Sequence, residues 1–206
     1  MKKNSNRSFW DRFAGLYDAF IRKDKNAYIE IFRLIRARVT SNMHVLELAT
    51  GTGLISIAIA DKVNSIEATD FSPQMIAEAK KKKSPNNVNF SVQDACHLTY
   101  EDGSFDAVII SNALHIMPNP ELALQNISRV LKKDGVLIAP TFTHASNDRR
   151  GKLKVKLMEL VGFKAYNKWT TEQYCAFLVH NGFIIEQKRV LTASFPLTYV
   201  EATKGF

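Results

Sequence analysis

Two glycines spaced two residues apart follow an apolar run in the first third of the chain. They are Gly51 and Gly53 in the stretch VLELATGTGLISIA, residues 45–58. Because glycine has no side chain, such a turn lets the backbone approach a ligand closely. Asp70 follows about 20 residues later, a spacing at which an acid can accept hydrogen bonds from both hydroxyls of a ribose. The pattern indicates a ligand that contains a ribose.

A nicotinamide dinucleotide would use the same turn and the same acid, but its fingerprint G-x-G-x-x-G needs a third glycine. Here the tripeptide Leu-Ile-Ser follows Gly53 instead. Glu47 also lies in the approach to the turn, where a carboxylate would repel a pyrophosphate and would favour a ligand with an ammonium group. The sequence therefore argues against a dinucleotide.

Strand and helix patterns alternate around these residues. Apolar runs bounded by turn residues predict five strands, at 43–49, 65–70, 88–94, 105–111 and 135–142. Helical periodicity or capping residues predict helices at 26–39, 54–63, 73–83, 120–131, 148–161 and 170–183. The closing runs at 183–192 and 196–204 are strand-like and close enough to pair antiparallel.

Some of these helices carry explicit predictions about their faces and ends. In the first, Ile29, Phe32, Ile35 and either Arg36 or Val39 are expected on one face. Ser72 is expected to cap the helix that starts at Pro73, and Thr170 the last helix, which Asn181-Gly182 would end. The helix at 120–131 is expected to end through Lys132, Lys133 and Asp134-Gly135.

This order of elements predicts an α/β fold. We expect a three-layer sandwich with a Rossmann-like, seven-stranded, mostly parallel sheet and an antiparallel C-terminal strand. Ligands of such sheets bind at the carboxyl ends of the strands. The turn at 47–53, Asp70 and the pair Gln93-Asp94 each follow a predicted strand, so they are expected to be neighbours.

Composition narrows the class of protein. The chain has 206 residues, 46% of them hydrophobic, and a formal charge of +8 that would favour anionic partners. It has no apolar run of the ~20 residues that span a bilayer and no apolar segment after its basic start, so we expect a cytoplasmic protein. Cys96 and Cys175 are expected to be reduced thiols, and the five histidines lack the spacing of a metal site.

Four stretches together resemble a class I S-adenosylmethionine (AdoMet)-dependent methyltransferase of the type called methyltransferase domain 11. The resemblance runs from about Trp10 to Thr143. The stretches are FWDRFAGLYDAF, VLELATGTG, ATDFSPQMIAEAK and VQDACHLTYEDGSFDAVIISNALHIMPNPELALQNISRVLKKDGVLI. It implies an enzyme that binds AdoMet and releases S-adenosylhomocysteine. Within one domain, 1–206, it implies a helical lid or substrate segment (1–40), an AdoMet-binding core (41–143) and substrate-side elements (144–206).

The resemblance also implies which residues contact the cofactor. They are Tyr17, Glu47, Ala49, Thr50, Gly51, Gly53, Asp70, Phe71, Ser72, Gln93, Asp94, Ala95, Ser111 and Asn112. Asp70 would hold the ribose hydroxyls, Asp94 would accept from the adenine amine, and Tyr17 would close over the methionine part. The alternatives are that Asp70 complements the N-terminus of the next helix and that Asp94 is an ordinary loop acid.

Ala49 departs from the family pattern E-x-G-x-G-x-G, in which a glycine stands at this position. Some relatives, including quinone C-methyltransferases, resemble this chain there. If Ala49 takes a positive φ, the strain is about 1 kcal/mol, too little to abolish binding.

Methyl transfer from a sulfonium needs alignment and exclusion of water more than acid chemistry, although a hydroxyl or carbon acceptor also needs a base. His115 follows the fourth predicted strand and is the candidate base; packing beside a helix is its alternative role.

Acceptor recognition is expected from two aromatic segments. One spans 9–20, including Phe9, Trp10, Phe13, Tyr17 and Phe20; the other contains Phe163, Tyr166 and Trp169. Core packing is the alternative for most of these side chains.

We expect a small-molecule acceptor, with lipids and quinones as a subset. Contact with an anionic or membrane surface would come from Arg149, Arg150, Lys152, Lys154 and Lys156, unless they form a solvated face. The sequence SNAL after the fourth strand differs from the N-P-P-Y pattern of nucleic-acid amine methyltransferases, which disfavours that class. A non-catalytic AdoMet-binding regulator stays open.

Overall fold

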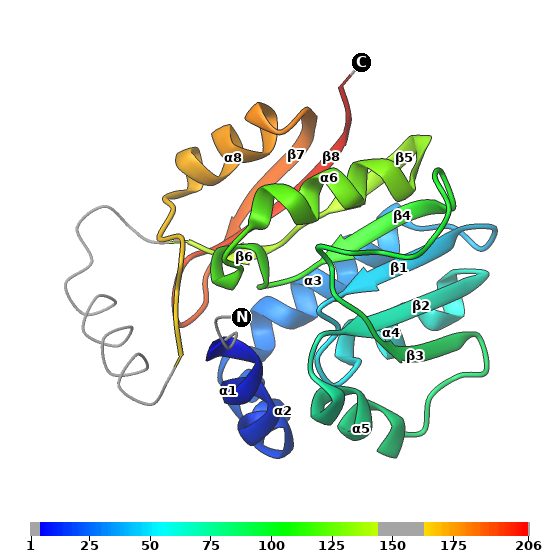
Figure 1. Ribbon diagram of the computed structural model, residues 1–206, viewed down its shortest axis with the longest axis vertical. Helices are drawn as coiled ribbons and strands as arrows, with labels where there is room; N and C mark the ends of the chain where they lie inside the picture. Colours follow the sequence, from blue (N-terminus) through cyan, green and yellow to red (C-terminus); the bar gives the residue numbers. More distant parts are fainter. Residues whose placement is uncertain (1–4, 144–162, 206) are drawn as a thin grey trace.

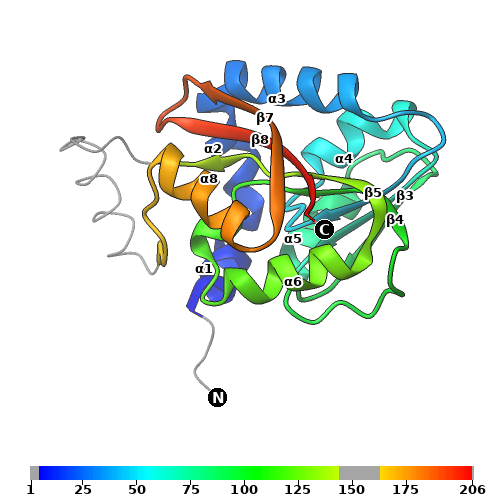
Figure 2. The ribbon, with the colours of Figure 1, turned by 90° about the horizontal axis from the view of Figure 1, so that it is seen from above.

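Helices pack on both faces of a central sheet, as Figures 1 and 2 show. The structure is a computed structural model and describes residues 5–143 and 163–205. In this part of the chain eight strands form one sheet in the order β3-β2-β1-β4-β5-β8-β6, with β7 pairing with β8. The strands are β1 His44–Leu48, β2 Ser65–Asp70, β3 Val88–Val92, β4 Phe105–Ile110, β5 Leu131–Ile138, β6 Thr141–Phe142, β7 Phe183–Leu191 and β8 Leu197–Lys204.

The helices fall into a core set and an N-terminal set. Those of the core are α3 Lys25–Arg38, α4 Leu54–Ile59, α5 Pro73–Lys81, α6 Pro120–Val130 and α8 Thr171–His180, with 3₁₀ turns η3 Ala60–Lys62 and η4 Leu114–Ile116. The N-terminal segment, residues 5–24, contains α1 Ser5–Phe13, η1 Ala14–Leu16, α2 Tyr17–Ile21 and η2 Arg22–Asp24.

The sheet confirms the predicted fold class. Strands β1 to β5 pair in parallel, and β8 pairs antiparallel with β5, β6 and β7. The strand expected at 135–142 is divided at Ala139-Pro140 into β5 and the short β6, so eight strands are found instead of seven. The ends of α5 and α8 are also as predicted, since Ser72 and Thr170 cap them through their side chains and Gly182 follows α8 at a φ of +85°.

The parallel strands are apolar on both sides because helices cover both faces of the sheet. Val45 of β1 packs in a cluster with residues of α3, α4 and α5. Its neighbours Leu46 and Leu48 point to the other face, where they join residues of α6 and α8. This two-sided burial fixes the register of the strands, so their carboxyl ends meet at one edge.

Two local predictions need correction. The expected face of α3 is found in part: Ile35 and Val39 are buried and Phe32 packs against the same cluster, but Ile29 is 51% exposed. Tyr28, Ile31 and Leu34 complete the buried face instead, because the helix packs against α4 and the sheet on that side.

The second error concerns the end of α6. The helix ends at Val130, and Leu131 turns extended to begin β5, which includes the segment 132–135 that was expected to form the cap. Leu131 is fully buried and pairs with Phe105, while Lys132 Nζ bonds Asp106 Oδ1 at 2.7 Å. These strand contacts hold the chain extended where residue types alone favoured a helix cap.

Gly53 is packed so tightly that a side chain would collide with the core. Its φ is +78°, and an added Cβ would lie 2.6 Å from Cζ of Phe90. We predict that Gly53→Ala lowers the free energy of unfolding by about 2–4 kcal/mol, combining left-handed strain with overpacking. Urea unfolding measures this loss. Gly103→Ala is the matched control, because Gly103 has a φ of +64° in open space and should lose only about 1 kcal/mol. Equal losses in both variants would contradict the packing argument.

Candidate active site

A cavity of about 620 Å³ lies at the carboxyl ends of β1, β2, β3 and β4. Its wall contains residues that follow each of these strands and residues of the N-terminal segment. Eleven of the fourteen predicted cofactor residues line it: Tyr17, Ala49, Gly51, Asp70, Phe71, Ser72, Gln93, Asp94, Ala95, Ser111 and Asn112. The candidate base His115 lines it as well. The predicted convergence of strand ends therefore exists as a single cavity.

The turn after β1 takes left-handed backbone conformations at alternate residues. Ala49, Gly51 and Gly53 have φ values of +53°, +57° and +78°. The positive φ at position 49 explains why the family pattern has a glycine there. Ala49 adopts this conformation at the cost of about 1 kcal/mol of backbone strain. At Gly51 an added Cβ would lie 3.2 Å from Cε1 of Tyr17, so this turn closely contacts the N-terminal segment.

Asp70 ends β2 and joins two neighbouring turns through its carboxylate. Oδ2 accepts from the backbone N–H of Gly51 at 2.9 Å, and Oδ1 accepts from that of Ser72 at 2.8 Å. Burial raises the pKa of Asp70 to about 6, although these two hydrogen bonds oppose the rise. Each carboxylate oxygen has a second lone pair, so Asp70 keeps the capacity to accept from a ribose while it orders the turn.

Glu47, Thr50 and Gly53 are buried and do not line the cavity. Glu47 is only 2% exposed, and its Oε2 accepts from Thr50 Oγ1 at 2.8 Å, from the Ser56 N–H at 3.0 Å and from the Ser56 hydroxyl. The carboxylate therefore braces the turn against the start of α4. Direct contact of these three residues with a cofactor stays a prediction.

The loop after β3 and the end of β4 supply further polar groups. Asp94 Oδ1 accepts from the Cys96 N–H at 2.9 Å, and His97 Nδ1 lies 3.2 Å from Oδ2, so the carboxylate both orders its loop and lines the cavity. Gln93 Nε2 donates to Tyr100 Oη at 2.8 Å. Gln93 Oε1 and Ser111 Oγ are buried without a partner among the described residues. A buried polar atom without a hydrogen bond destabilises the folded protein, and a bound ligand that supplied the missing hydrogen bond would remove this destabilisation.

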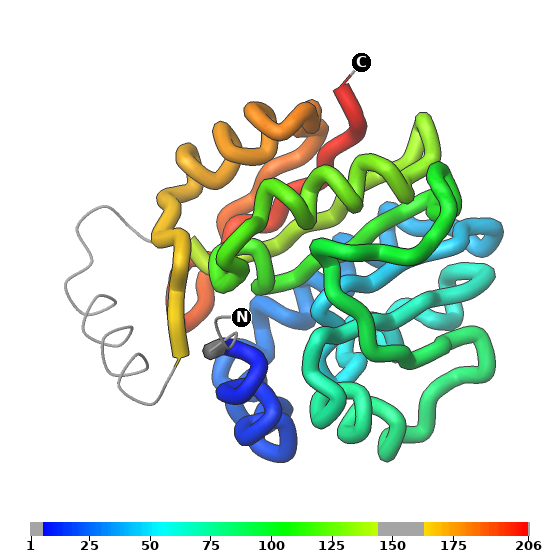
Figure 3. The backbone as a smooth tube through the Cα atoms, in the orientation of Figure 1, coloured from blue at the N-terminus to red at the C-terminus, as the bar shows by residue number. Residues whose placement is uncertain are grey.

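The N-terminal segment crosses the cavity and is held there by acidic side chains. Figure 3 shows this segment, in blue, beside α5 and the chain around residue 163. Asp18 accepts from Thr52 Oγ1 at 2.5 Å and pairs with Lys82 Nζ at 2.7 Å, while Asp11 accepts from Ser72 Oγ at 2.5 Å. Each anchor ends on a residue in or next to the cofactor turns, so closure of the segment and order of the turns are coupled.

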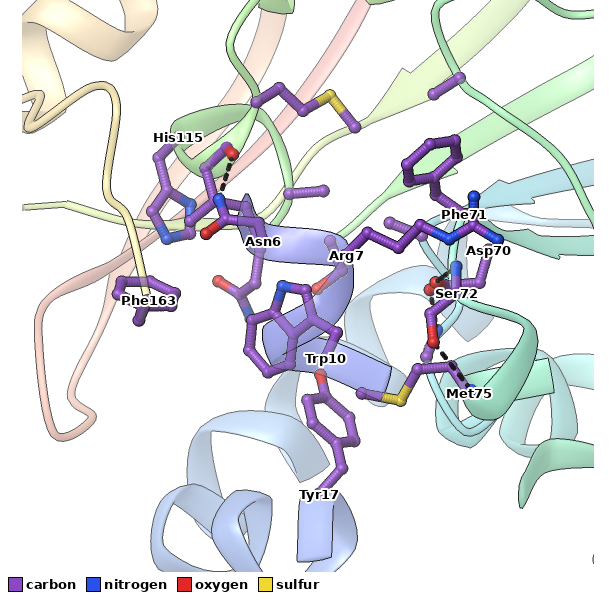
Figure 4. A pocket seen from close by; sticks show the side chains of 18 of the residues that line it. Asn6, Arg7, Trp10, Tyr17, Asp70, Phe71, Ser72, Met75, His115 and Phe163 are labelled. Atoms are coloured by element: carbon purple, nitrogen blue, oxygen red, sulfur yellow. Dashed lines mark hydrogen bonds between the residues drawn. The ribbon is translucent and has the colours of Figure 1, made fainter. Parts of the chain in front are cut away.

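His115 lies in η4 on the cavity wall. It is buried, and its Nδ1 lies 2.9 Å from the hydroxyl of Thr141. In Figure 4 it stands with Phe163 on one side of α1, whereas Asp70, Phe71 and Ser72 stand on the other. This places the candidate base away from Asp70, the predicted ribose-binding acid.

The predicted aromatic segments separate into cavity and core residues. Trp10, Phe20 and Phe163 line the cavity, and Phe9 is buried against Phe163. Trp169 instead stacks on Phe177 of α8, at 4.5 Å between ring centroids.

Sequence reasoning missed several wall residues. They are Asn6, Arg7, Ile21, Tyr28, Met75, Phe142 and Phe195. Tyr28 could have been found from the helical face that continues through Ile31 and Ile35, while the others depend on how distant loops meet. The predicted basic surface from Arg149 to Lys156 lies outside the described residues.

The residues present fit the adenosyl group of AdoMet. Asp70 offers paired acceptors, Phe71 and Met75 offer apolar surface beside it, and the left-handed turn at Gly51 leaves room for close approach. Across residues 5–143 and 163–205, no three His, Cys, Asp or Glu side chains gather as they would around a metal ion. No helix of the described chain is long and apolar enough to cross a membrane.

Residues 46–139 match the family model described as a methyltransferase domain. This segment, less than half of the chain, is similar to that family. The match confirms the predicted resemblance and supports AdoMet as the ligand of the cavity. The structure of DhpI with bound SAH (S-adenosylhomocysteine) superposes with a TM-score of 0.76 at 23% identity, over 98% of this chain and 96% of that one, which confirms the fold.

Two curated relatives name acceptors of different kinds. A demethylmenaquinone methyltransferase from Renibacterium salmoninarum is 38% identical over 100 residues, which cover 48% of this chain and 41% of the relative. A malonyl-(acyl-carrier protein) O-methyltransferase from Bacillus cereus is 29% identical over 132 residues, covering 62% of this chain and 49% of the relative. The chain thus spans less than half the length of each.

The two buried carboxylates make the stability of the ligand-free protein depend on pH. Burial raises the pKa of Glu47 to about 7, above the ordinary value of 4.5, so the folded state holds a proton that the unfolded state has lost between these pH values. Stability is therefore highest below pH 4.5 as far as Glu47 is concerned, and it falls as pH rises to about 7.

We predict that Glu47→Gln reduces this pH dependence. Between pH 5 and 7 the wild type should lose stability relative to the variant by up to about 1.4 kcal/mol per pH unit. Urea unfolding at pH 5, 6, 7 and 8 measures the difference, with Glu101→Gln, an exposed acid outside the site, as the control. Parallel pH curves for wild type and Glu47→Gln would contradict the assignment.

Proposed function

We propose that the protein is an AdoMet-dependent methyltransferase that acts on a small-molecule acceptor. The observation that carries the proposal is the arrangement around Asp70, whose carboxylate orders the Gly51 turn at the edge of a cavity built from four strand ends. The match of residues 46–139 to the methyltransferase domain family supports the same conclusion. Residues 46–139 hold all the predicted cofactor residues except Tyr17, and the rest of the wall comes from the N-terminal segment, α3 and the chain after residue 139.

In this proposal Asp70 binds the ribose hydroxyls, Asp94 and Ala95 bind the adenine, and Ser111 contacts the methionine part. Bound AdoMet would supply a methyl group carried on a sulfonium. Once the methyl group is transferred, the sulfur is left as a neutral thioether, so the leaving group needs no proton. The chain therefore has to orient the acceptor and exclude water. Trp10 and Tyr17 serve the second task, since they pack edge to face at 5.9 Å across the N-terminal segment.

The far end of the cavity favours an apolar acceptor. There Phe142 packs edge to face against both His115 and Phe195, and Asn112 joins Phe142 to Tyr28. Such a wall suits a ring compound or an acyl chain better than a nucleic-acid phosphate. The named acceptors of the relatives, a quinone precursor and a malonyl thioester, both present a carbon or oxygen next to a carbonyl system. A quinone-like or lipid acceptor is the finer form of the proposal.

Binding of the cofactor is tested by calorimetry with AdoMet, S-adenosylhomocysteine and NAD. We expect both adenosyl ligands to bind and NAD not to bind. Asp70→Asn should lower the affinity for S-adenosylhomocysteine about 10- to 100-fold, because hydrogen bonds to a charged group are worth about 1.5–3 kcal/mol. Asp134→Asn, an exposed acid outside the cavity, should bind as the wild type does. Thermal unfolding checks that the Asp70 variant is folded, since its new amide faces two N–H donors. A preference for NAD would contradict the proposal.

His115 is proposed as the base that removes a proton from a hydroxyl or activated carbon acceptor. The contact with Thr141 holds its ring at the acceptor end of the cavity. We predict that His115→Ala lowers transfer of radiolabelled methyl into the acceptor fraction of a cell extract about 100-fold or more, with unchanged binding of S-adenosylhomocysteine. His180→Ala, at the exposed end of α8, is the control.

Full turnover in His115→Ala would end the role of base without touching the cofactor assignment. Separating the extract into lipid, small-molecule, protein and nucleic-acid fractions identifies the acceptor class. Wild-type protein that labels no fraction would favour a non-catalytic AdoMet-binding regulator.

A further inference from the structure

The side chain of Asn112 links β4, β6 and α3 at the acceptor end of the cavity. Asn112 follows β4 with a left-handed φ of +52°. Its Oδ1 accepts from the backbone N–H of Phe142 at 3.0 Å, and its Nδ2 lies 3.0 Å from Tyr28 Oη. A backbone N–H can only donate, so the Phe142 contact fixes the amide with its NH₂ group toward Tyr28.

This orientation decides the role of the Tyr28 hydroxyl. Because an amide NH₂ only donates, the phenol oxygen of Tyr28 must accept from Asn112, and its own proton is not used in that bond. The hydroxyl of Tyr17 lies close enough to that of Tyr28 to influence its pKa. In the bond with Asn112, whose direction the chemistry of the amide fixes, Tyr28 is the acceptor, so its proton can be directed to a ligand.

Tyr28 stays protonated under ordinary conditions. The side chain is 5% exposed, and burial raises its pKa to about 12 despite the hydrogen bonds with Asn112 and Tyr17. Burial likewise raises the pKa of Tyr17 well above its ordinary value. The pair thus offers a neutral donor at any physiological pH, and a buried O–H of this kind gains most by meeting an oxygen of a ligand.

The surroundings of Tyr28 select the kind of ligand. Phe142 and Phe195 lie on the same cavity wall, at 6.2 Å between ring centroids. The nearby carboxylate of Asp24 is occupied by the hairpin between β7 and β8, because its Oδ1 accepts from the N–H and hydroxyl of Ser194 at 2.6 and 2.8 Å. A neutral donor among aromatic rings suits an uncharged ring compound with an oxygen atom.

We propose that Tyr28 is a specificity-determining residue that donates a hydrogen bond to a carbonyl or hydroxyl oxygen of an apolar ring acceptor. The proposal rests on the function proposed above and names the substrate class for that site. Asn112 acts as a positioning residue: it engages the oxygen of Tyr28 and leaves the proton for the ligand.

The test uses full-length protein saturated with S-adenosylhomocysteine and two probes with one ring skeleton. 1-Tetralone carries a carbonyl oxygen, and tetralin lacks it. We expect Tyr28→Phe to lower the affinity for 1-tetralone about 3- to 10-fold, which corresponds to the loss of one net hydrogen bond. The affinity for tetralin should not change. Tyr166→Phe, outside the cavity wall, should alter neither affinity. Tyr17→Phe should retain most of the difference between the probes, because the Tyr28 proton is still present.

An infrared measurement tests the same hydrogen bond without relying on affinities. The carbonyl stretch of bound ¹³C-labelled 1-tetralone should shift to lower wavenumber than in hexane, and Tyr28→Phe should abolish most of this shift. An unshifted carbonyl, equal weakening of both probes by Tyr28→Phe, or failure of the saturated wild type to bind 1-tetralone would overturn the assignment of Tyr28. Failure to bind S-adenosylhomocysteine would instead overturn the proposed function.

Discussion

The carboxylate of Asp70 is the interaction on which the site depends. It receives the N–H groups of Gly51 and Ser72, so one side chain orders the turns that follow both β1 and β2. A parallel sheet brings these turns together, but backbone N–H groups at strand ends need partners before the turns take one conformation. Holding the carboxylate there costs part of its hydration, and its pKa is raised for this reason. A ligand with ribose hydroxyls would meet an acceptor that is already oriented.

The N-terminal segment forms one wall of the cavity at this edge of the sheet. Its aspartates face inward: Asp11 meets Ser72, Asp18 meets Thr52 and Lys82, and Asp24 meets Ser194. The segment therefore touches the cofactor turns at one end and the β7–β8 hairpin at the other. Tyr17 of this segment lies against both Gly51 and Tyr28. One side chain therefore connects the turn after β1 with the wall that contains Tyr28.

The fold and the cofactor half of the site followed from sequence because both depend on local patterns. Strand runs, the glycine turn and the acid at Asp70 are each set by short-range spacing, and parallel strands bring them together without further information. The acceptor half did not follow in the same way. Tyr28 belongs to a helix whose inward face was assigned to Ile29, and Asn112, Phe142 and Phe195 meet only through tertiary contacts. The division of the fifth strand and the end of α6 were missed for the same reason, since strand pairing overrode local residue preference.

The most direct test of the central claim is a crystal structure of the protein with S-adenosylhomocysteine. The account predicts ribose hydroxyls within hydrogen-bonding distance of Asp70, the adenine beside Phe71 and Asp94, and the homocysteine sulfur facing the end of the cavity that contains His115 and Tyr28. Ligand density at another place, or a ribose bound without Asp70, would contradict it.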